Sequence, residues 1–172
     1  MATSKRRSAL GRHEVDPLDA RAARAAALDA LARRDHASGD LHRKLLEKGY
    51  DAAVVAPLLD ALRGEKLLDD RRFTENFVAY HAARGQGPLR IRAELRRHGL
   101  EGILAEESLD AFPDWILHLR RVRQKKFGAA LPVNYVDRQR QARFLGYRGF
   151  TSAQIRTALG FDTDLDADTL EI

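Results

Sequence analysis

Two adjacent carboxylates, Asp69 and Asp70, are the residues of this sequence best suited by type to catalysis or metal binding. Paired carboxylates can hold Mg²⁺ or move protons in acid–base catalysis. The pair also directly precedes the run RRFTENFVAYHAAR, where a carboxylate would cap the first helical turn and suit its dipole. No third ligand stands beside the pair. We therefore favour capping and keep a Mg²⁺-dependent enzyme as an alternative.

A second candidate is the stretch GQGPLRIRAELRRHGL, residues 85–100, which begins like a phosphate-binding loop. It lacks the third glycine of a dinucleotide loop and the Gly-Lys-Ser/Thr of a P-loop, and it follows a helical pattern instead of a strand. We therefore expect no nucleotide there. Gly85 and Gly99 are expected to end helices, and Pro88 to occupy the first turn of the helix between them.

The remaining residues contain no other pattern typical of a catalytic or metal-binding site. The chain has no cysteine, its six histidines form no pair spaced four apart, and no nucleophile-elbow motif occurs. We therefore expect no catalytic residue, no metal site and no cofactor, and a protein that is not an enzyme. No apolar run is long enough to span a membrane, and the N-terminal MATSKRRSALGRHEVD lacks an apolar core, so a soluble cytoplasmic protein is expected.

Charge is unevenly distributed along the 172 residues, whose formal net charge is +5. Residues 161–172 hold five acids and no Lys or Arg, which leaves +10 on residues 1–160. Residues 113–149 alone carry +7. The positive charge of residues 1–160 should attract polyanions or an acidic protein surface. The acidic tail, residues 161–172, is expected to be mobile and to screen part of that charge.

Capping residues, glycines and prolines at helix-like spacing indicate helices throughout the chain. No segment alternates with the period of a strand. The expected helix starts are Asp16-Pro17, Ser38, Asp51, Asp69 or Asp70, Pro88 and the Thr151–Gln154 capping box. Gly49 and Gly64 should end helices, and Pro57 should kink its helix or shift its start. Phe73, Phe77 and Tyr80 are expected on one helix face. Nine helices fit the chain.

The decisive pattern is a gapless repeat of fifty residues. Glycines 49, 99 and 149 align, preceded four places earlier by Leu45, Leu95 and Leu145 and followed by Tyr50, Leu100 and Phe150. Apolar pairs follow in the same register at 55 and 59, 105 and 109, and 155 and 159. Each leucine should be buried, and each glycine should take a left-handed turn that brings the next apolar residue over the helix end.

The repeat predicts an all-α fold, an elongated stack of three tandem three-helix repeats whose cores depend on stacking. The expected segments are a flexible basic tail at 1–15, repeats at 16–66, 67–112 and 113–160, and the acidic tail at 161–172. We expect a monomer.

Residues 67–101, LLDDRRFTENFVAYHAARGQGPLRIRAELRRHGLE, resemble the RecX family of proteins that regulate bacterial RecA recombinase. LHRKLLEKGY before this stretch and RQARFLGYRGFTSAQI after it are also similar to that family. The resemblance covers residues 18–160 and implies three tandem three-helix repeats. It further implies a protein of DNA repair that binds RecA filaments in their helical groove, blocks their growth and inhibits ATPase, strand-exchange and coprotease activities. Some members also bind single- or double-stranded DNA. Pro57 and the acidic tail depart from the family pattern.

Basic residues on two expected helices are the candidates for contact with RecA or DNA. They are Arg90, Arg92, Arg96, Arg97, Arg120, Arg121, Arg123, Lys125 and Lys126. Arg121 and Lys125 stand out because they lie one turn apart, away from the expected buried stripe of Trp115, Ile116, Leu119 and Val122, with no acid beside them. Lys125 and Lys126 also simply suit a helix C-terminus.

A helical nucleic-acid-binding protein remains the alternative function. RGFTSAQIRTAL, residues 148–159, is superficially similar to a recognition helix, although Arg156 is its only strong reader of bases.

Overall fold

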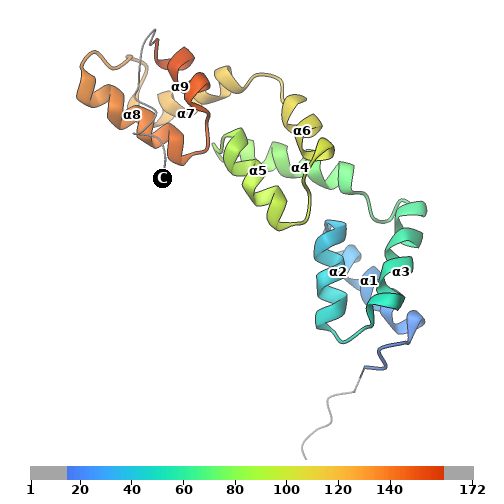
Figure 1. Ribbon diagram of the computed structural model, residues 1–172. Coiled ribbons are helices and arrows are strands. Elements are labelled where there is room, and N and C mark those ends of the chain that lie inside the picture. The colour runs from blue at the N-terminus through green and yellow to red at the C-terminus, as the bar shows by residue number, and fades with distance from the viewer. Residues whose placement is uncertain (1–14, 161–172) are drawn as a thin grey trace, which may run out of the picture. The chain divides into compact units, whose positions relative to one another are not determined.

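The computed structural model describes residues 15–160, which form nine helices and no strand (Figure 1). The predicted all-α fold is thus confirmed for this part of the chain, while nearly all of the expected basic tail (1–15) and the acidic tail (161–172) lie outside the described residues. The helices are α1 (Ala20–Arg33), α2 (Ser38–Glu47), α3 (Ala52–Gly64), α4 (Asp70–Ala83), α5 (Pro88–Arg97), α6 (Ile103–Asp110), α7 (Trp115–Phe127), α8 (Tyr135–Tyr147) and α9 (Ser152–Leu159).

The chain divides into two compact units. The first holds α1, α3 and α2 from Asp40 onward. The second holds residues 36–39 together with α4 to α9. The second unit therefore contains the second and third helix triplets, and it carries all nine candidate contact residues.

The same turn closes the middle helix of all three triplets. Gly49, Gly99 and Gly149 have φ values of +99°, +77° and +89°. In the second triplet, the N–H of Leu100 donates to the carbonyl of Leu95 at 3.0 Å, and the equivalent bonds in the other two triplets are 3.2 Å long. This arrangement satisfies carbonyls at the helix end and requires the left-handed backbone that glycine adopts without strain. The predicted role of the three glycines is confirmed.

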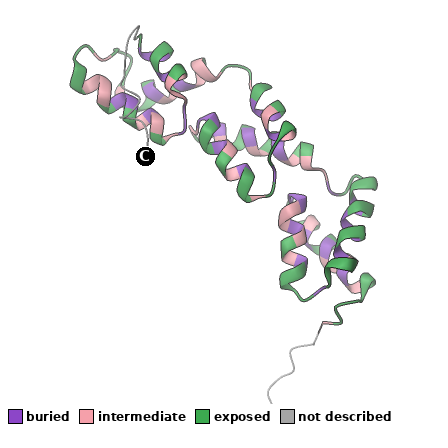
Figure 2. Ribbon diagram, in the orientation of Figure 1, coloured by how far each residue is buried: buried purple, intermediate pink, exposed green. Residues whose placement is uncertain are grey.

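Burial confirms the rest of the predicted register. Leu45, Leu95 and Leu145 are no more than 1% exposed, and the apolar residues at 55, 105 and 155 are equally buried. The buried residues form three core clusters, one centred on each triplet, and the second also includes Ala37, which precedes α2. Figure 2 shows buried residues on all three triplets. Within the second unit, the half-buried Trp115 packs against the core clusters of both the second and the third triplet.

The start of α1 differs from the prediction. The helix begins at Ala20 and is capped by Asp19, whose carboxylate accepts the N–H groups of Arg21 and Ala22, both at 2.9 Å. Asp16 instead accepts the N–H of Leu18 at 3.0 Å in the preceding turn. Asp19 satisfies two free helical donors at once, and this stabilises the later start over the expected Asp16-Pro17 start.

The third helix, α3, also differs from the prediction at one end. It begins after Asp51, as expected, and continues through Pro57, so the proline does not shift its start. Gly64 is the last helical residue and does not make the left-handed turn. Lys66 takes that conformation, with φ of +57°, and its N–H donates to the carbonyl of Arg63 at 3.0 Å.

Aromatic packing in the second unit follows the prediction in part. Phe73 and Phe77 pack together with ring centroids 5.8 Å apart, and His98 lies 5.1 Å from the ring of Phe77. Tyr80 is 57% exposed and does not share their buried environment. Its ring instead lies under the guanidinium of Arg84, 5.3 Å away, which leaves the end of α4 polar.

Candidate functional site

Asp69 and Asp70 divide two structural tasks between them. Asp69 is the N-cap of α4 and accepts the N–H of Arg72 at 3.0 Å, which confirms the capping interpretation. Asp70 accepts the N–H of Ser38 at 2.7 Å and also the Ser38 hydroxyl proton. Ser38 is therefore a donor at the first position of α2, not the acceptor cap that we expected. No group of three or more His, Asp or Glu suited to a metal ion occurs within residues 15–160.

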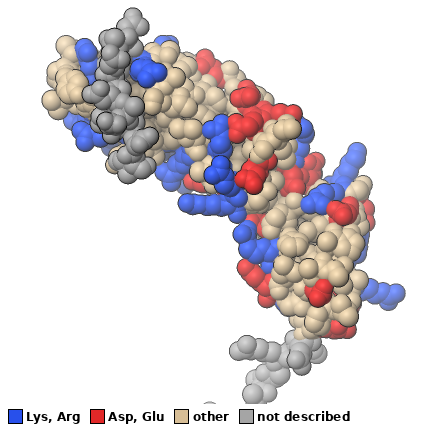
Figure 3. Space-filling view, viewed as in Figure 1, with Lys and Arg blue, Asp and Glu red and all other residues tan. Residues whose placement is uncertain are grey.

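The cations of α5 are largely neutralised by neighbouring acids. Arg92 makes a bidentate pair with Glu106, with both N–O distances at 2.6 Å. The same contact raises the pKa of Arg92 and lowers the pKa of Glu106. Arg90 pairs with Glu94 at 3.2 Å, and Arg96 with Glu101 at 3.5 Å. Red and blue side chains accordingly lie next to one another over α4 to α6 in Figure 3.

Arg123 has an internal role. It is only 3% exposed and lies on the buried side of α7, next to the expected stripe. Its guanidinium donates to the carbonyls of Gly128, Ala129 and Ala130 at 2.5, 3.1 and 2.8 Å. These bonds fold the connection after α7 back onto the helix. The sequence analysis grouped Arg123 with the contact residues, but its hydrogen-bonding capacity is directed inside the repeat.

The exposed face of α7 has the opposite character. Arg120, Arg121, Lys125 and Lys126 are exposed, and none of them forms an ion pair with a described residue. Asp114, the N-cap of this helix, accepts the N–H of Leu117 at 2.9 Å, three or more turns from the lysines. Like charges therefore accumulate on α7, and no acidic side chain within residues 15–160 pairs with them to reduce their mutual repulsion.

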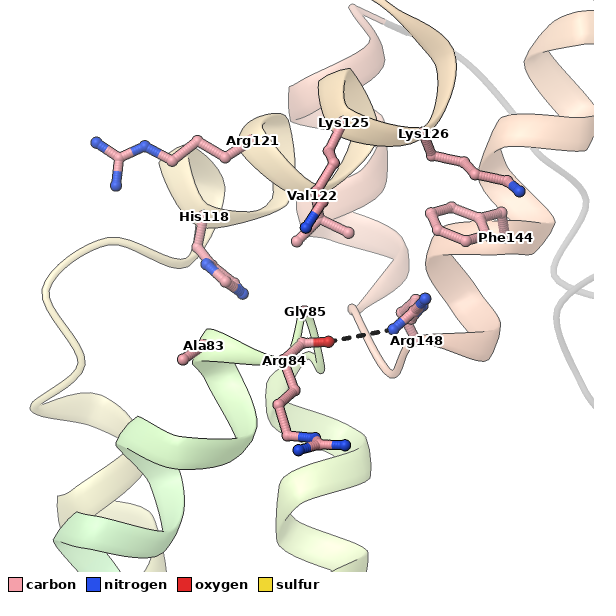
Figure 4. Close-up of a pocket in the computed structure, with 10 residues that line it drawn as sticks. All are labelled: Ala83, Arg84, Gly85, His118, Arg121, Val122, Lys125, Lys126, Phe144 and Arg148. Atoms are coloured by element: carbon pink, nitrogen blue, oxygen red, sulfur yellow. Dashed lines mark hydrogen bonds between the residues drawn. The ribbon is translucent and has the colours of Figure 1, made fainter.

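Beside this face lies a pocket of about 540 Å³, formed where α7 and α8 meet the end of α4 (Figure 4). Figure 4 shows His118 and Lys125 pointing from α7 toward the turn at Arg84 and Gly85, while Arg121 extends outward at the rim. Arg148 enters from α8 and donates to the carbonyl of Arg84 at 3.2 Å. Three of the predicted contact residues, Arg121, Lys125 and Lys126, thus line one pocket.

No acidic side chain of residues 15–160 lines this pocket. Its apolar part includes Val122 and Phe144, and the Arg148 guanidinium lies 5.2 Å from the centre of the Phe144 ring. The guanidinium of Arg84 points away and donates to the Tyr80 hydroxyl at 2.8 Å. The pocket therefore offers hydrogen-bond donors and positive charge on a partly apolar floor.

His118 is half-buried and lines the pocket. Its Nε2 atom is buried and has no hydrogen-bond partner among the described residues. Burial lowers the pKa of His118, the charge of Arg121 lowers it further, and a backbone contact with Gln86 acts in the opposite direction. The surroundings thus favour the neutral imidazole, and its buried Nε2 atom has no hydrogen-bond partner among the described residues.

The sequence analysis did not single out three of the pocket residues, His118, Arg84 and Arg148. They come from three different helix ends that meet only through the packing of the second unit. The only sequence signal was the position of Arg148 directly before Gly149, since a residue there must lie at the end of its helix.

The helices and this basic surface define a class of protein: one built from tandem three-helix repeats that presents exposed cations on one helix. The chain belongs to the RecX family. Models of the first, second and third RecX three-helix domains match residues 23–62, 69–109 and 118–159. Within the described residues, no helix has the length and apolar character needed to cross a membrane.

Two relatives illustrate the similarity. The chain is 47% identical to "Regulatory protein RecX" of Halorhodospira halophila over 138 residues, covering 80% of this chain and 86% of the relative. It is 44% identical to the protein of the same name from Pseudomonas savastanoi pv. phaseolicola over 130 residues, covering 75% and 84%.

Solved structures share the fold at low sequence identity. The crystal structure of RecX from Lactobacillus salivarius is 18% identical, with a TM-score of 0.73, and the match covers 83% of this chain and 95% of that one. A crystal structure of regulatory protein RecX is 23% identical, with a TM-score of 0.70, covering 81% and 70%. The predicted family and the predicted three tandem repeats are confirmed.

Proposed function

We propose that this protein binds RecA filaments and inhibits the recombinase, ATPase and coprotease activities of RecA. The family assignment supports a regulatory role, and the name of the relatives points to a RecA-related partner. The observation that carries the proposal is the accumulation on α7 of cations that form no ion pair with any residue between 15 and 160. A basic face that the described part of the chain leaves uncompensated is suited to an acidic partner surface.

Arg121 and Lys125 are the centre of the proposed contact surface, with Arg120 and Lys126 beside them. All four are exposed on one helix, so a partner can approach them without rearranging the core. Arginine can also form bidentate bonds to a carboxylate, which adds geometric specificity to attraction by charge. We leave Arg123 out of this surface because carbonyl groups already occupy its guanidinium.

The arginines of α5 have a secondary place in the proposal. A partner that binds Arg92 has to compete with the bidentate carboxylate of Glu106, and the same argument applies to the pairs of Arg90 and Arg96. Such exchange of one carboxylate for another gains little free energy. The cations of α7 have no internal competitor of this kind among the described residues.

Under this proposal the protein is a cytoplasmic, monomeric binding protein that acts in DNA repair without catalysing a reaction. The same cations are suited to DNA phosphates, so direct DNA binding is the competing explanation of any effect on RecA. The two explanations differ in one respect: only the first requires RecA itself for binding.

The test is co-sedimentation with RecA filaments assembled on single-stranded DNA, with the same DNA sedimented on beads in the absence of RecA. We expect the protein to pellet with filaments and to remain in the supernatant with DNA alone at about 0.15 M salt, where weak phosphate contacts are screened. Equal recovery on DNA alone and on filaments would assign the protein to nucleic-acid binding and contradict the proposal.

A further inference from the structure

We propose that the pocket between α7, α8 and the end of α4 is a binding site for a chain of linked phosphate groups, such as a nucleoside triphosphate or inorganic tripolyphosphate. This inference goes beyond the proposed function and does not depend on RecA binding. It rests on the side chains around the pocket, on its size, and on a buried nitrogen atom that nothing in the described chain satisfies.

The polar side chains that enter the pocket are donors. Lys125 and Arg148 are cations, and they approach it from opposite walls, as Figure 4 shows. The carbonyl oxygen of Arg84, an acceptor in the wall, is already used by Arg148 at 3.2 Å. A ligand that satisfies such a site must be an acceptor with negative charge. Phosphate oxygens meet both requirements, and guanidinium groups bind them with two parallel hydrogen bonds.

His118 provides an independent observation. Its Nε2 atom is buried without a partner, although an unsatisfied buried polar atom typically costs about 1–3 kcal/mol. The ring points from α7 toward the turn at Gly85, into the space between the walls (Figure 4). The ring already contacts the backbone of Gln86, so Nε2 becomes a donor when the imidazole takes up a proton beside the anion, and an oxygen atom of the ligand can then accept from it.

Charge and size together favour linked phosphates over a single one. Lys125 and Arg148 lie inside the pocket, and Arg121 and Lys126 lie at its rim. Four cations therefore surround the space that a ligand would occupy. One phosphodiester of a nucleic acid brings a single negative charge into such a space. Three linked phosphates bring about three to four negative charges within a few ångströms of one another. The volume of about 540 Å³ is in the range of pockets that enclose small ligands.

The test is isothermal titration of the full chain with sodium tripolyphosphate at low salt, without divalent cations. We expect one saturable site per chain, which weakens about tenfold or more in Lys125→Gln because a charge-assisted hydrogen bond is lost. Lys48→Gln is the matched control, since Lys48 is an exposed lysine in the first unit, at the end of α2. Absence of a saturable site, or equal weakening in both variants, overturns the proposal.

Two further arms identify the source of the phosphates and the place of binding. ATP that binds as tightly as tripolyphosphate, or more tightly, supports the proposal and shows whether the nucleoside contributes. A single-stranded oligonucleotide that binds in a Lys125-dependent manner while tripolyphosphate does not bind overturns it. In the parent protein, NMR shifts at the His118 ring and the Gly85 amide should saturate with tripolyphosphate. Shifts elsewhere without these two contradict the site even if the Lys125 variant fails to fold.

Discussion

The backbone of Gly87 lies directly against that of Gly149 in the second unit. The N–H of Gly87 donates to the carbonyl of Arg148 at 2.7 Å, and the N–H of Leu89 donates to the carbonyl of Gly149 at 2.9 Å. A β-carbon on Gly87 would lie 2.5 Å from the carbonyl carbon of Gly149. The start of α5 and the end of α8 are thus joined by main-chain hydrogen bonds at a distance that only glycine permits. Arg148, next to this contact, lines the pocket between α7, α8 and the end of α4.

Substitution of Gly87 by alanine should therefore destabilise the protein by about 1–3 kcal/mol, as overpacking against backbone does elsewhere. Urea unfolding measures the change. Gly64→Ala is the matched control, because a β-carbon on Gly64 meets nothing within 4 Å, so this variant should be neutral or slightly stabilising. Equal stability of the Gly87 variant and the parent would show that the close contact is absent in solution.

Lys66 is expected to be replaceable by glycine with a gain in stability. It holds a left-handed φ of +57°, which disfavours side chains with a β-carbon by about 1–2 kcal/mol. The greater freedom of glycine in the unfolded chain offsets part of that gain, so we expect Lys66→Gly to stabilise by about 0.5–1 kcal/mol. Thermal unfolding measures it, with Gly99→Ala expected to show the opposite sign. A loss of stability in Lys66→Gly would mean that the lysine side chain makes a compensating contact.

Asp69 and Asp70 should respond differently to substitution. Asp69→Asn should change stability by less than about 0.5 kcal/mol, because asparagine is an equally good N-cap. Asp70→Ala should cost about 1–3 kcal/mol, because the partly buried donors of Ser38 lose their acceptor. Chemical denaturation separates the two. If Mg²⁺ instead stabilises the parent but not the Asp69→Asn variant, the pair is a metal site and the capping account is wrong.

His118 should make the protein less stable in mild acid. Burial lowers its pKa, so as the pH falls below about 6.5 the unfolded chain takes up the proton before the folded protein does. Its contribution to the unfolding free energy is complete above that pH and declines as the pH falls through the lowered value. The charge of Arg121 lowers the pKa of His118 further, and the backbone contact with Gln86 opposes both effects.

Urea unfolding at pH 7.5 and pH 5.5 measures this loss. It should be smaller in His118→Gln than in the parent, whereas His42→Gln, on the partly exposed side of α2, should leave it unchanged. A His118→Gln variant with the full loss of stability would show that the imidazole is solvated in the folded protein.

The fold could be predicted from the sequence because its strongest signals are local. The glycine, the leucine four places before it and the apolar residue after it interact within one helix end, so a gapless repeat was enough to place Leu95 and Gly99. Residues whose role depends on distant contacts were harder. Asp70 binds Ser38, and Arg123 is held by carbonyls of a loop whose path no periodic pattern predicts. The pocket was missed for the same reason.

The central claim is that this protein acts on RecA through the exposed cations of α7. Its most direct test is the single-stranded-DNA-dependent ATPase of RecA, measured with the parent, with Arg121→Glu/Lys125→Glu, and with Arg34→Glu/Lys48→Glu as a control of equal charge change in the first unit. We predict that the parent and the control inhibit alike, and that the α7 variant inhibits clearly less, most of all at low salt. Unimpaired inhibition by a folded α7 variant at every salt concentration would contradict the account.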